Sequence, residues 1–128
     1  MNPQQRILAA ALLFVALGIV IAQQQNCCAW PIMGSGITNV TINEFKCNEA
    51  IALKCVRSAI SVVSVGIYGG NGGPADGSII SLGIDSVEET LVCGKSEKWT
   101  VNGQGQGAFD YFGCAYRMID NGQWVFDK

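Results

Sequence analysis

Apolar and polar side chains alternate along most of the chain beyond residue 36, and glycine-rich stretches separate the alternating segments. Alternation of period two is typical of strands with one buried face, because successive side chains of a strand point to opposite sides. In residues 37–42 the polar face carries Asn39 and Thr41. In residues 80–84 the isoleucines and Leu82 share a face, which we expect to be half buried.

Residues 112–126 show the pattern of a β-hairpin. Apolar side chains alternate along both of its strands: Phe112, Cys114, Tyr116, Met118, Trp124 and Phe126. Between the strands, Asp120-Asn121-Gly122 supplies a turn that tolerates positive φ. Further short strands are expected at residues 63–68, 91–93 and 98–101.

The segment 48–60 (NEAIALKCVRSAI) is compatible with two structures. An amphipathic helix would stack Ile51, Cys55 and Ser58 on one side. A strand would instead place Ile51, Leu53 and Cys55 on one face. We favour the strand, because every neighbouring segment alternates with period two, and a bulge or turn must follow it where the phase of the pattern breaks.

About seven or eight short strands with short connections predict an all-β fold, a small antiparallel β-sandwich of two layers. Two glycine-rich stretches, residues 69–77 and 102–107, separate some of these strands. Neither stretch has the Gly-Lys-Ser/Thr ending of a phosphate-binding loop, and neither matches G-x-G-x-x-G. We therefore interpret both as strand connections.

The first twenty-two residues have the features of a secretory signal peptide. Arg6 precedes fifteen uncharged residues, 7–21, and Val20-Ile21-Ala22 places small or compact residues at a cleavage site. The uncharged run is shorter than the roughly twenty residues that a transmembrane helix needs. We expect residues 1–22 to be removed, which leaves a single domain over residues 23–128 and a secreted, extracellular protein.

The charge balance limits the partners that the chain can bind. Eight Lys and Arg stand against ten Asp and Glu, a formal net charge of −2, which becomes −3 when Arg6 is removed with the signal peptide. A weakly acidic surface without basic runs argues against nucleic acid and against anionic membranes. We expect neither as a partner after signal cleavage, and we expect no cofactor.

The chain contains six cysteines, all beyond the predicted cleavage site, and no histidine. An even number of cysteines in an oxidising compartment indicates three disulfides. Without Cys-x-x-Cys pairs we expect no metal site, and without an imidazole the Ser-His-Asp and Cys-His mechanisms are excluded. The cysteines are Cys27, Cys28, Cys47, Cys55, Cys93 and Cys114. A bond between the adjacent first two would close a strained ring, so we expect them to reach different strands, and spacing leaves fifteen pairings open.

Four features accompany these cysteines in order. They are a cysteine pair near the mature N-terminus, KCNEAIALKC with Cys47 and Cys55, a glycine-rich centre, ETLVCGKSEKW with Cys93, and YFGC ending at Cys114. This order resembles a family of extracellular six-cysteine domains found mainly in nematode secreted and surface proteins. The chain departs from the family in its directly adjacent first cysteines and in the hairpin beyond Cys114. The family has no established activity, so the resemblance implies a fold rather than a function.

The resemblance also implies a pairing of the first and third cysteines, Cys27–Cys47. For the other four we then expect Cys55–Cys93 and Cys28–Cys114. A Cys55–Cys93 bond would enclose about forty residues and stabilise the fold by roughly 4 kcal/mol through chain entropy.

Asn39-Val40-Thr41 is the only Asn-x-Ser/Thr triplet in the chain. The alternation places Asn39 and Thr41 on the polar face of their expected strand, where the transferase can reach them. We therefore expect a glycoprotein with its glycan on Asn39.

Two sets of residues offer chemistry that needs no histidine. Carboxylate pairs can hydrolyse glycosides, and acids in or beside polar loops are Asp76, Asp85, Glu88, Glu89 and Asp110. No feature marks one of them as buried, so we expect no enzymatic activity.

Aromatic side chains can stack on sugars, and the candidates are Trp30, Trp99, Trp124 and Tyr68. Trp99 is close to Cys93 in sequence, however, which is typical of a side chain packed against a disulfide in the core.

The function expected from the sequence is that of a secreted, non-catalytic interaction or matrix module, because a rigid scaffold carries long loops and no reactive constellation. The alternative is a secreted binding protein directed at glycans, or at a host or microbe. In either case the partner is an extracellular protein or glycan that the sequence does not identify.

Overall fold

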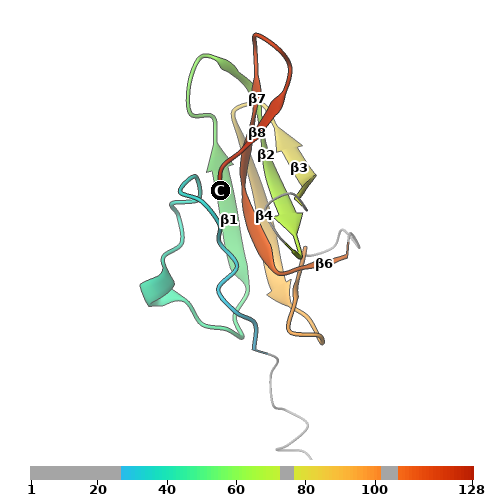
Figure 1. Cartoon of the computed structure of the whole chain (residues 1–128). Helices are drawn as coiled ribbons and strands as arrows, with labels where there is room; N and C mark the ends of the chain where they lie inside the picture. Colours follow the sequence, from blue (N-terminus) through green and yellow to red (C-terminus); the bar gives the residue numbers. More distant parts are fainter. Residues whose placement is uncertain (1–26, 73–76, 102–106) are drawn as a thin grey trace, which may run out of the picture.

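The computed structural model describes residues 27–72, 77–101 and 107–128, so the predicted signal peptide lies outside the described part. It contains one short 3₁₀ helix and eight strands: η1 (Ile42–Glu44), β1 (Ile51–Val56), β2 (Val62–Gly70), β3 (Ser78–Gly83), β4 (Ser86–Cys93), β5 (Trp99–Val101), β6 (Ala108–Phe109), β7 (Tyr111–Met118) and β8 (Trp124–Phe126). The strands form two antiparallel sheets, which we call sheet I (order β1-β4-β5-β6) and sheet II (order β3-β2-β7-β8). The sheets form the two layers seen in Figure 1, which confirms the predicted all-β fold.

Strand β1 and the β7–β8 hairpin follow the sequence pattern directly. In β1 the side chains of Ile51, Leu53 and Cys55 are buried and alternate with exposed ones, which confirms the strand rather than the helix. β7 pairs with β8 around a turn in which Gly122 has φ of 68°, the left-handed conformation that glycine adopts without strain. The first glycine-rich stretch is a connection only in part, because Gly69 and Gly70 are the last two residues of β2 and pair with β7. The remainder of this stretch connects β2 to β3 and the second stretch connects β5 to β6, with residues 73–76 and 102–106 outside the described part.

The strand predicted over residues 37–42 does not form. Residues 37–41 form neither helix nor strand, and Ile42 opens η1. On the face predicted to carry Val40 and Ile42, Val40 is half-buried but Ile42 is 63% exposed, whereas Ile37, which alternation would place on the opposite face, is buried. The prediction was wrong because this segment meets no strand: the edge of β1 next to it bonds the side chain of Asn39 instead.

The half-buried face predicted for residues 80–84 was also wrong. A register shift between Ile67 and Tyr68 inserts an extra residue into β3. Ile80 therefore packs against the core and Ser81 contacts Glu89 of the other sheet. After a bulge the next side chain changes face, so Leu82 is 64% exposed instead of half buried.

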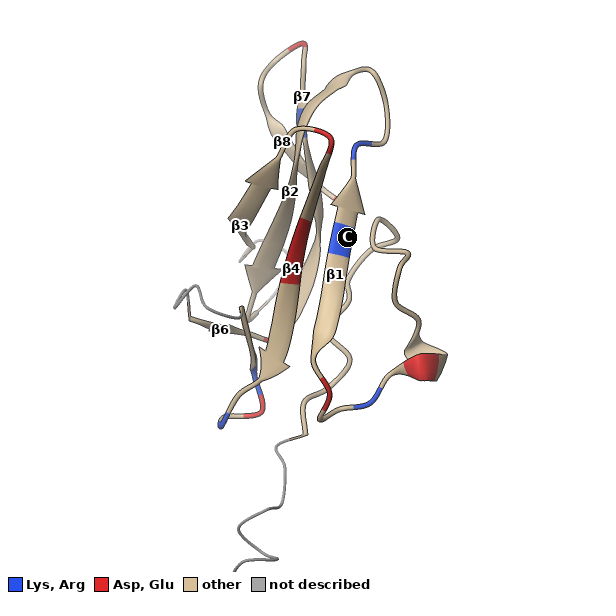
Figure 2. Ribbon diagram, turned by 180° about the vertical axis from the view of Figure 1, so that it is seen from behind, with Lys and Arg blue, Asp and Glu red and all other residues tan. Residues whose placement is uncertain are grey.

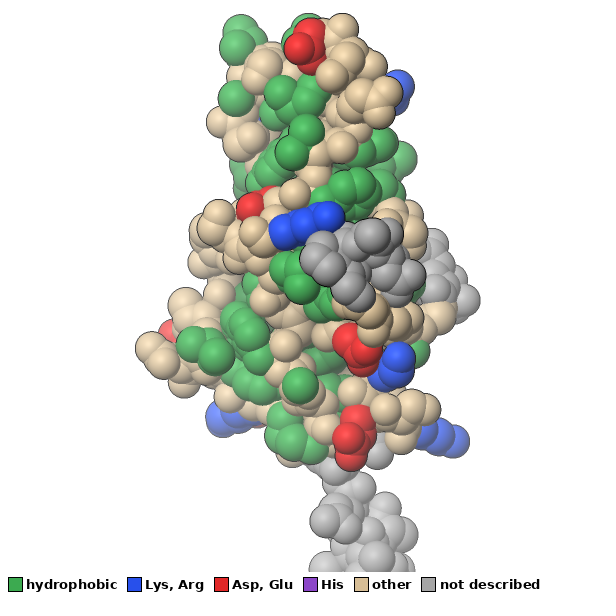
Figure 3. Space-filling view, in the orientation of Figure 1, with side chains coloured by type: hydrophobic (Ala, Val, Ile, Leu, Met, Phe, Trp, Pro, Cys, Tyr) green, Lys and Arg blue, Asp and Glu red, His purple; other side chains and the backbone are tan. Residues whose placement is uncertain are grey.

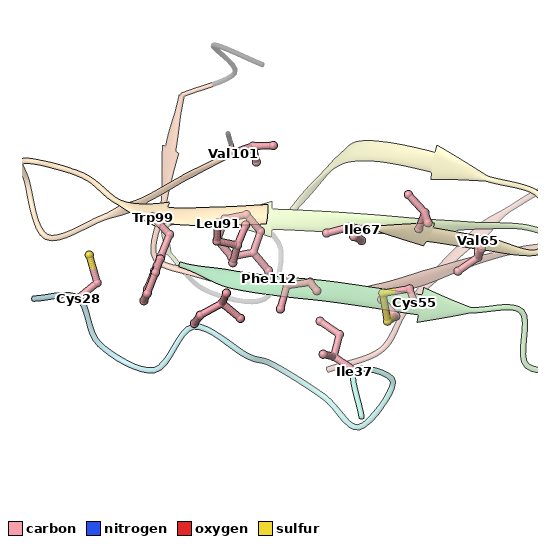
Figure 4. Packing of buried hydrophobic residues seen from close by; sticks show 13 residues of the cluster. Cys28, Ile37, Cys55, Val65, Ile67, Leu91, Trp99, Val101 and Phe112 are labelled. Atoms are coloured by element: carbon pink, nitrogen blue, oxygen red, sulfur yellow. A yellow bond between two sulfur atoms is a disulfide. The ribbon is translucent and has the colours of Figure 1, made fainter. Parts of the chain in front are cut away.

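The core contains apolar side chains from both sheets and from the segment before β1, as Figure 4 shows: Cys28, Ile37, Ile51, Leu53, Cys55, Val65, Ile67, Val87, Leu91, Trp99, Val101, Phe112 and Cys114. Trp99 is the largest of these and is 1% exposed. It lies opposite Cys93 in the β4–β5 pair and beside Cys28 in Figure 4. Its indole N–H donates to the backbone oxygen of Ala29 at 2.8 Å, so burial leaves no polar atom unsatisfied and ties the segment before β1 to sheet I.

Three disulfides are present: Cys27–Cys47, Cys28–Cys93 and Cys55–Cys114. The first pairing was predicted, whereas the predicted Cys55–Cys93 and Cys28–Cys114 were wrong. Strand register explains why. Cys55 lies opposite Val87, and Cys93 is six residues further along β4, about 20 Å away. Cys55 faces Cys114 of β7 instead, so this bridge joins the two sheets through the core.

The outer face of sheet II carries a second apolar cluster around Tyr68, which is fully buried. Its ring lies over Gly113, where a Cβ atom would come within 2.6 Å of the ring, so only glycine fits. The Tyr68 hydroxyl donates to the backbone oxygen of Asp127 at 2.5 Å. The rings of Tyr68 and Phe126 meet edge-on, with centroids 5.0 Å apart. These contacts tie β8 and the residue after it to Tyr68 of β2, across the outer face of sheet II.

Replacing Cys55 and Cys114 with alanine is expected to destabilise the protein more than replacing Cys27 and Cys47. The first bridge spans 59 residues and the second 20, for which chain entropy gives about 4 and about 3 kcal/mol. Loss of the buried bridge also leaves a cavity in the core. Denaturant unfolding of both double variants measures the difference, and a larger loss for the Cys27–Cys47 variant would contradict the role given to the buried bridge.

A second prediction concerns alkaline pH. Burial, with smaller contributions from Asp127 and Tyr111, raises the pKa of Tyr68 from 10.0 to about 12. Between these values the folded state keeps a proton that the unfolded state releases, so stability is complete below pH 10 and falls as the pH rises toward 12. In Tyr68→Phe this loss should be smaller, although Tyr116, whose pKa burial also raises, retains part of it.

The measurement for Tyr68 is the free energy of unfolding as a function of pH for both proteins. At neutral pH the variant should be about 1 kcal/mol less stable, because it lacks the hydrogen bond to Asp127. An identical pH dependence in the two proteins would show that Tyr68 does not cause the alkaline loss.

Candidate functional site

A groove of about 270 Å³ lies between the segment that precedes β1 and the first residues of β1. Its apolar lining comes from Trp30, Val40, Phe45 and Ile51, and its polar lining includes Asn39, Thr41, Glu44, Lys46 and Glu49. The groove therefore combines an aromatic floor with hydrogen-bonding groups at the rim, a composition typical of ligand sites.

The aromatic floor is continuous with the core. The rings of Trp30 and Phe45 meet edge-on with centroids 5.3 Å apart, and Phe45 lies 6.3 Å from the ring of Trp99. Trp30 and Phe45 are half-buried, so part of each ring faces the groove. The Cys27–Cys47 disulfide and a backbone hydrogen bond from Cys28 to Cys47 (3.0 Å) join the two ends of this segment. The floor is thus held in place before any ligand arrives, which lowers the entropy cost of binding.

The rim of the groove carries more acceptors than cations. Lys46 forms an ion pair with Glu49 at 3.7 Å, with both side chains more than 60% exposed, and such surface pairs contribute little to stability. Glu44, in η1, is a second carboxylate at this rim. The carboxylates of Glu44 and Glu49 can accept hydrogen bonds from hydroxyl or amide donors of a ligand that packs on the rings.

Asn39, the predicted glycosylation site, binds the edge of β1 through its side chain. Its Nδ2 donates to the backbone oxygen of Ala52 at 2.7 Å, and its Oδ1 accepts from the backbone N–H of Lys54 at 3.2 Å. One carboxamide thus replaces a neighbouring strand over two residues. An edge whose donors and acceptors are occupied is a poor template for pairing with another chain.

This contact has a consequence for the glycosylation that the sequence predicts at Asn39. Both backbone partners lie on one edge of β1, so Nδ2 uses the hydrogen on the same side as Oδ1. A glycan in the usual trans amide linkage replaces that hydrogen. The glycosylated chain would therefore lose the bond to Ala52. Glycosylation of Asn39 stays a prediction.

The candidate carboxylates do not come together as a catalytic pair. Each of the four described ones has its own partner: Asp85 with Arg57, Glu88 with Lys54, Glu89 with Ser81, and Asp110 with Lys98. Glu88 and Glu89 are adjacent in β4 and point to opposite faces of sheet I. Figure 2 shows the acidic band on β4 beside the basic band on β1. Asp76 lies outside the described residues.

The four aromatic candidates are likewise separated. Tyr68 and Trp99 are buried, Trp124 packs on the outer face of sheet II, and Trp30 alone lines the groove. Phe45, the partner of Trp30, was not among the residues predicted from the sequence. Its position two residues before Cys47, inside the loop that the Cys27–Cys47 bond closes, was the available signal.

The described part of the chain offers neither a metal site nor a membrane-spanning helix. Among residues 27–72, 77–101 and 107–128 no three His, Cys, Asp or Glu side chains lie close enough to hold a metal ion. Within the same residues no helix is long and apolar enough to cross a membrane.

Comparisons of the chain with known protein families, with curated proteins and with solved structures found no match.

The role of Asn39 can be separated from that of the glycosylation triplet. Asn39→Ala removes both hydrogen bonds to β1 and should cost about 1 kcal/mol of stability in unglycosylated protein. Thr41→Ala removes the triplet but keeps Asn39, so stability should change by less than about 0.5 kcal/mol. Thermal unfolding of both variants, made without glycosylation, gives the comparison; equal stabilities would mean that the edge contact contributes nothing.

Proposed function

We propose that this protein is a secreted, non-catalytic module that binds an extracellular protein through the groove beside β1. The observation that carries the proposal is the pair of half-buried rings, Trp30 and Phe45, which line an open groove and are fixed by a disulfide loop. Aromatic side chains in such grooves dominate the binding energy of many interfaces. An apolar side chain of the partner would pack on the rings, and its backbone amides would donate to the rim carboxylates.

Secretion is supported by the three disulfides, which persist in oxidising compartments. The apolar run at residues 7–21, interpreted as a signal peptide, agrees with this. The absence of a free cysteine among the described residues leaves no thiol there for nucleophilic or redox chemistry.

A glycan ligand is the second candidate. It is favoured by Trp30, because sugar rings stack on partly exposed indole faces, and by Glu44 and Glu49, which can accept hydrogen bonds from hydroxyl groups. A protein partner and a glycan would use the same groove. The two candidates are told apart by whether a protein or a glycan saturates binding at the groove.

The test compares the purified protein with Trp30→Ala on an array of extracellular proteins and on a glycan array. Trp124→Ala is the matched control, since Trp124 is also a half-buried tryptophan but lies on sheet II. We expect a protein partner whose affinity falls about tenfold or more with Trp30→Ala and is nearly unchanged with Trp124→Ala.

A saturable glycan signal that Trp30→Ala abolishes, with no protein partner found, would show that the ligand of the groove is a glycan. Partner binding that both tryptophan variants weaken equally would show that the groove is not the binding site. Each variant must first show the three intact disulfides and the circular dichroism of the parent.

A further inference from the structure

Seven large apolar side chains are exposed at the end of the sandwich where β1 stops and β2 begins. The same end holds the β3–β4 and β7–β8 turns, because these strands are antiparallel neighbours. We call this set the apolar tip: Val56, Ile60, Val63, Leu82, Ile84, Ile119 and Val125. Ile60 is 89% exposed, Ile84 71% and Ile119 66%. Figure 3 shows hydrophobic side chains gathered at the upper end of the molecule, over the turns that follow β1 and β7.

The three turns of the apolar tip are joined to one another. The backbone N–H of Arg57 donates to the oxygen of Asp85 at 2.8 Å, and that of Ile119 donates to the oxygen of Ser61 at 2.8 Å. The guanidinium of Arg57 also lies 3.9 Å from the Asp85 carboxylate. Backbone groups bonded to each other can enter an apolar medium at low cost. The isoleucines are therefore presented by a preorganised support.

The apolar side chains surround the tip instead of lying on one plane. Val56 is on the outer face of sheet I and Leu82 is on the outer face of sheet II, with the three isoleucines at the turns between them. A rigid protein surface would cover one side of such a convex end. A lipid layer into which the end dips covers all sides at once.

The charged residues at the apolar tip indicate whether the lipid surface is anionic or neutral. The charged residues in or beside the three turns are two cations and two anions, Arg57, Arg117, Asp85 and Asp120. The whole chain has a formal net charge of −2. Neither the tip nor the rest of the chain favours an anionic surface.

We propose that the apolar tip inserts into the interface of a neutral, zwitterionic lipid layer, with Ile60, Ile84 and Ile119 entering first. This departs from the expectation that the mature chain has no membrane partner, which was based on its net charge and its lack of basic runs. The tip lies beyond the last residue of β1, whereas the groove lies beside its first residues. The inference is therefore independent of the proposed function.

The experiment is co-sedimentation of the protein with phosphatidylcholine vesicles. The double variant Ile60→Ser/Ile119→Ser should bind at least about tenfold more weakly, given the free energy of transferring each side chain from water. Ile84→Ser is a second, single-site variant. Ile42→Ser is the matched control, since Ile42 is 63% exposed but lies in η1, away from the tip, and it should bind like the parent. Adding phosphatidylserine should weaken binding at low salt.

Three results would overturn the inference. The first is no sedimentation with either kind of vesicle. The second is a loss with Ile42→Ser as large as that with the tip variants. The third is self-association of the parent, seen by analytical ultracentrifugation and abolished by the tip variants, without vesicle binding; the tip would then contact a second copy. Trp30→Ala should leave vesicle binding unchanged, so failure of this inference and failure of the groove proposal are distinguishable.

Discussion

The bond between Cys55 and Cys114 is the constraint on which the rest of the structure depends. It connects Cys55, next to the last residue of β1 in sheet I, to Cys114 in the middle of β7 in sheet II, inside the core. Small domains bury a limited share of their surface, so their cores alone give modest stability. A covalent link between the two layers restricts the unfolded chain and fixes how the two sheets face each other. The other side chains of the core then pack around this fixed point.

The groove depends on the same scaffold, because the segment that lines it is attached to sheet I. Residues 27–50 contain no strand, so the Cys28–Cys93 bond and the hydrogen bond from Trp99 to Ala29 hold them against sheet I. The Asn39 carboxamide completes this attachment at the edge of β1. An irregular segment fixed at these points can present Trp30 and Phe45 to solvent without folding over them. The binding surface is thus formed by the part of the chain with the least regular structure.

The sequence predicted the elements whose pattern is local. Strand β1 and the β7–β8 hairpin alternate cleanly, and Asp120-Asn121-Gly122 marks its turn without reference to the rest of the chain. The failures depended on distant contacts. Leu82 changed face because of a bulge opposite β2, and residues 37–42 had no strand to pair with because a side chain occupied the edge. Disulfide pairing and the meeting of Trp30 with Phe45 follow from strand register and from how a loop lies, which composition and spacing do not encode.

The disulfide map of the unreduced protein tests the central claim most directly. Cleavage after Lys46, Lys54, Arg57 and Lys98 places Cys47, Cys55, Cys93 and Cys114 on four different peptides, all separate from the peptide that holds Cys27 and Cys28. Mass spectrometry should then find the Cys55 peptide joined only to the Cys114 peptide, and the adjacent Cys27-Cys28 peptide joined to both Cys47 and Cys93. A Cys55 peptide joined to Cys93 would contradict the account, because the two sheets would then lack their covalent link through the core.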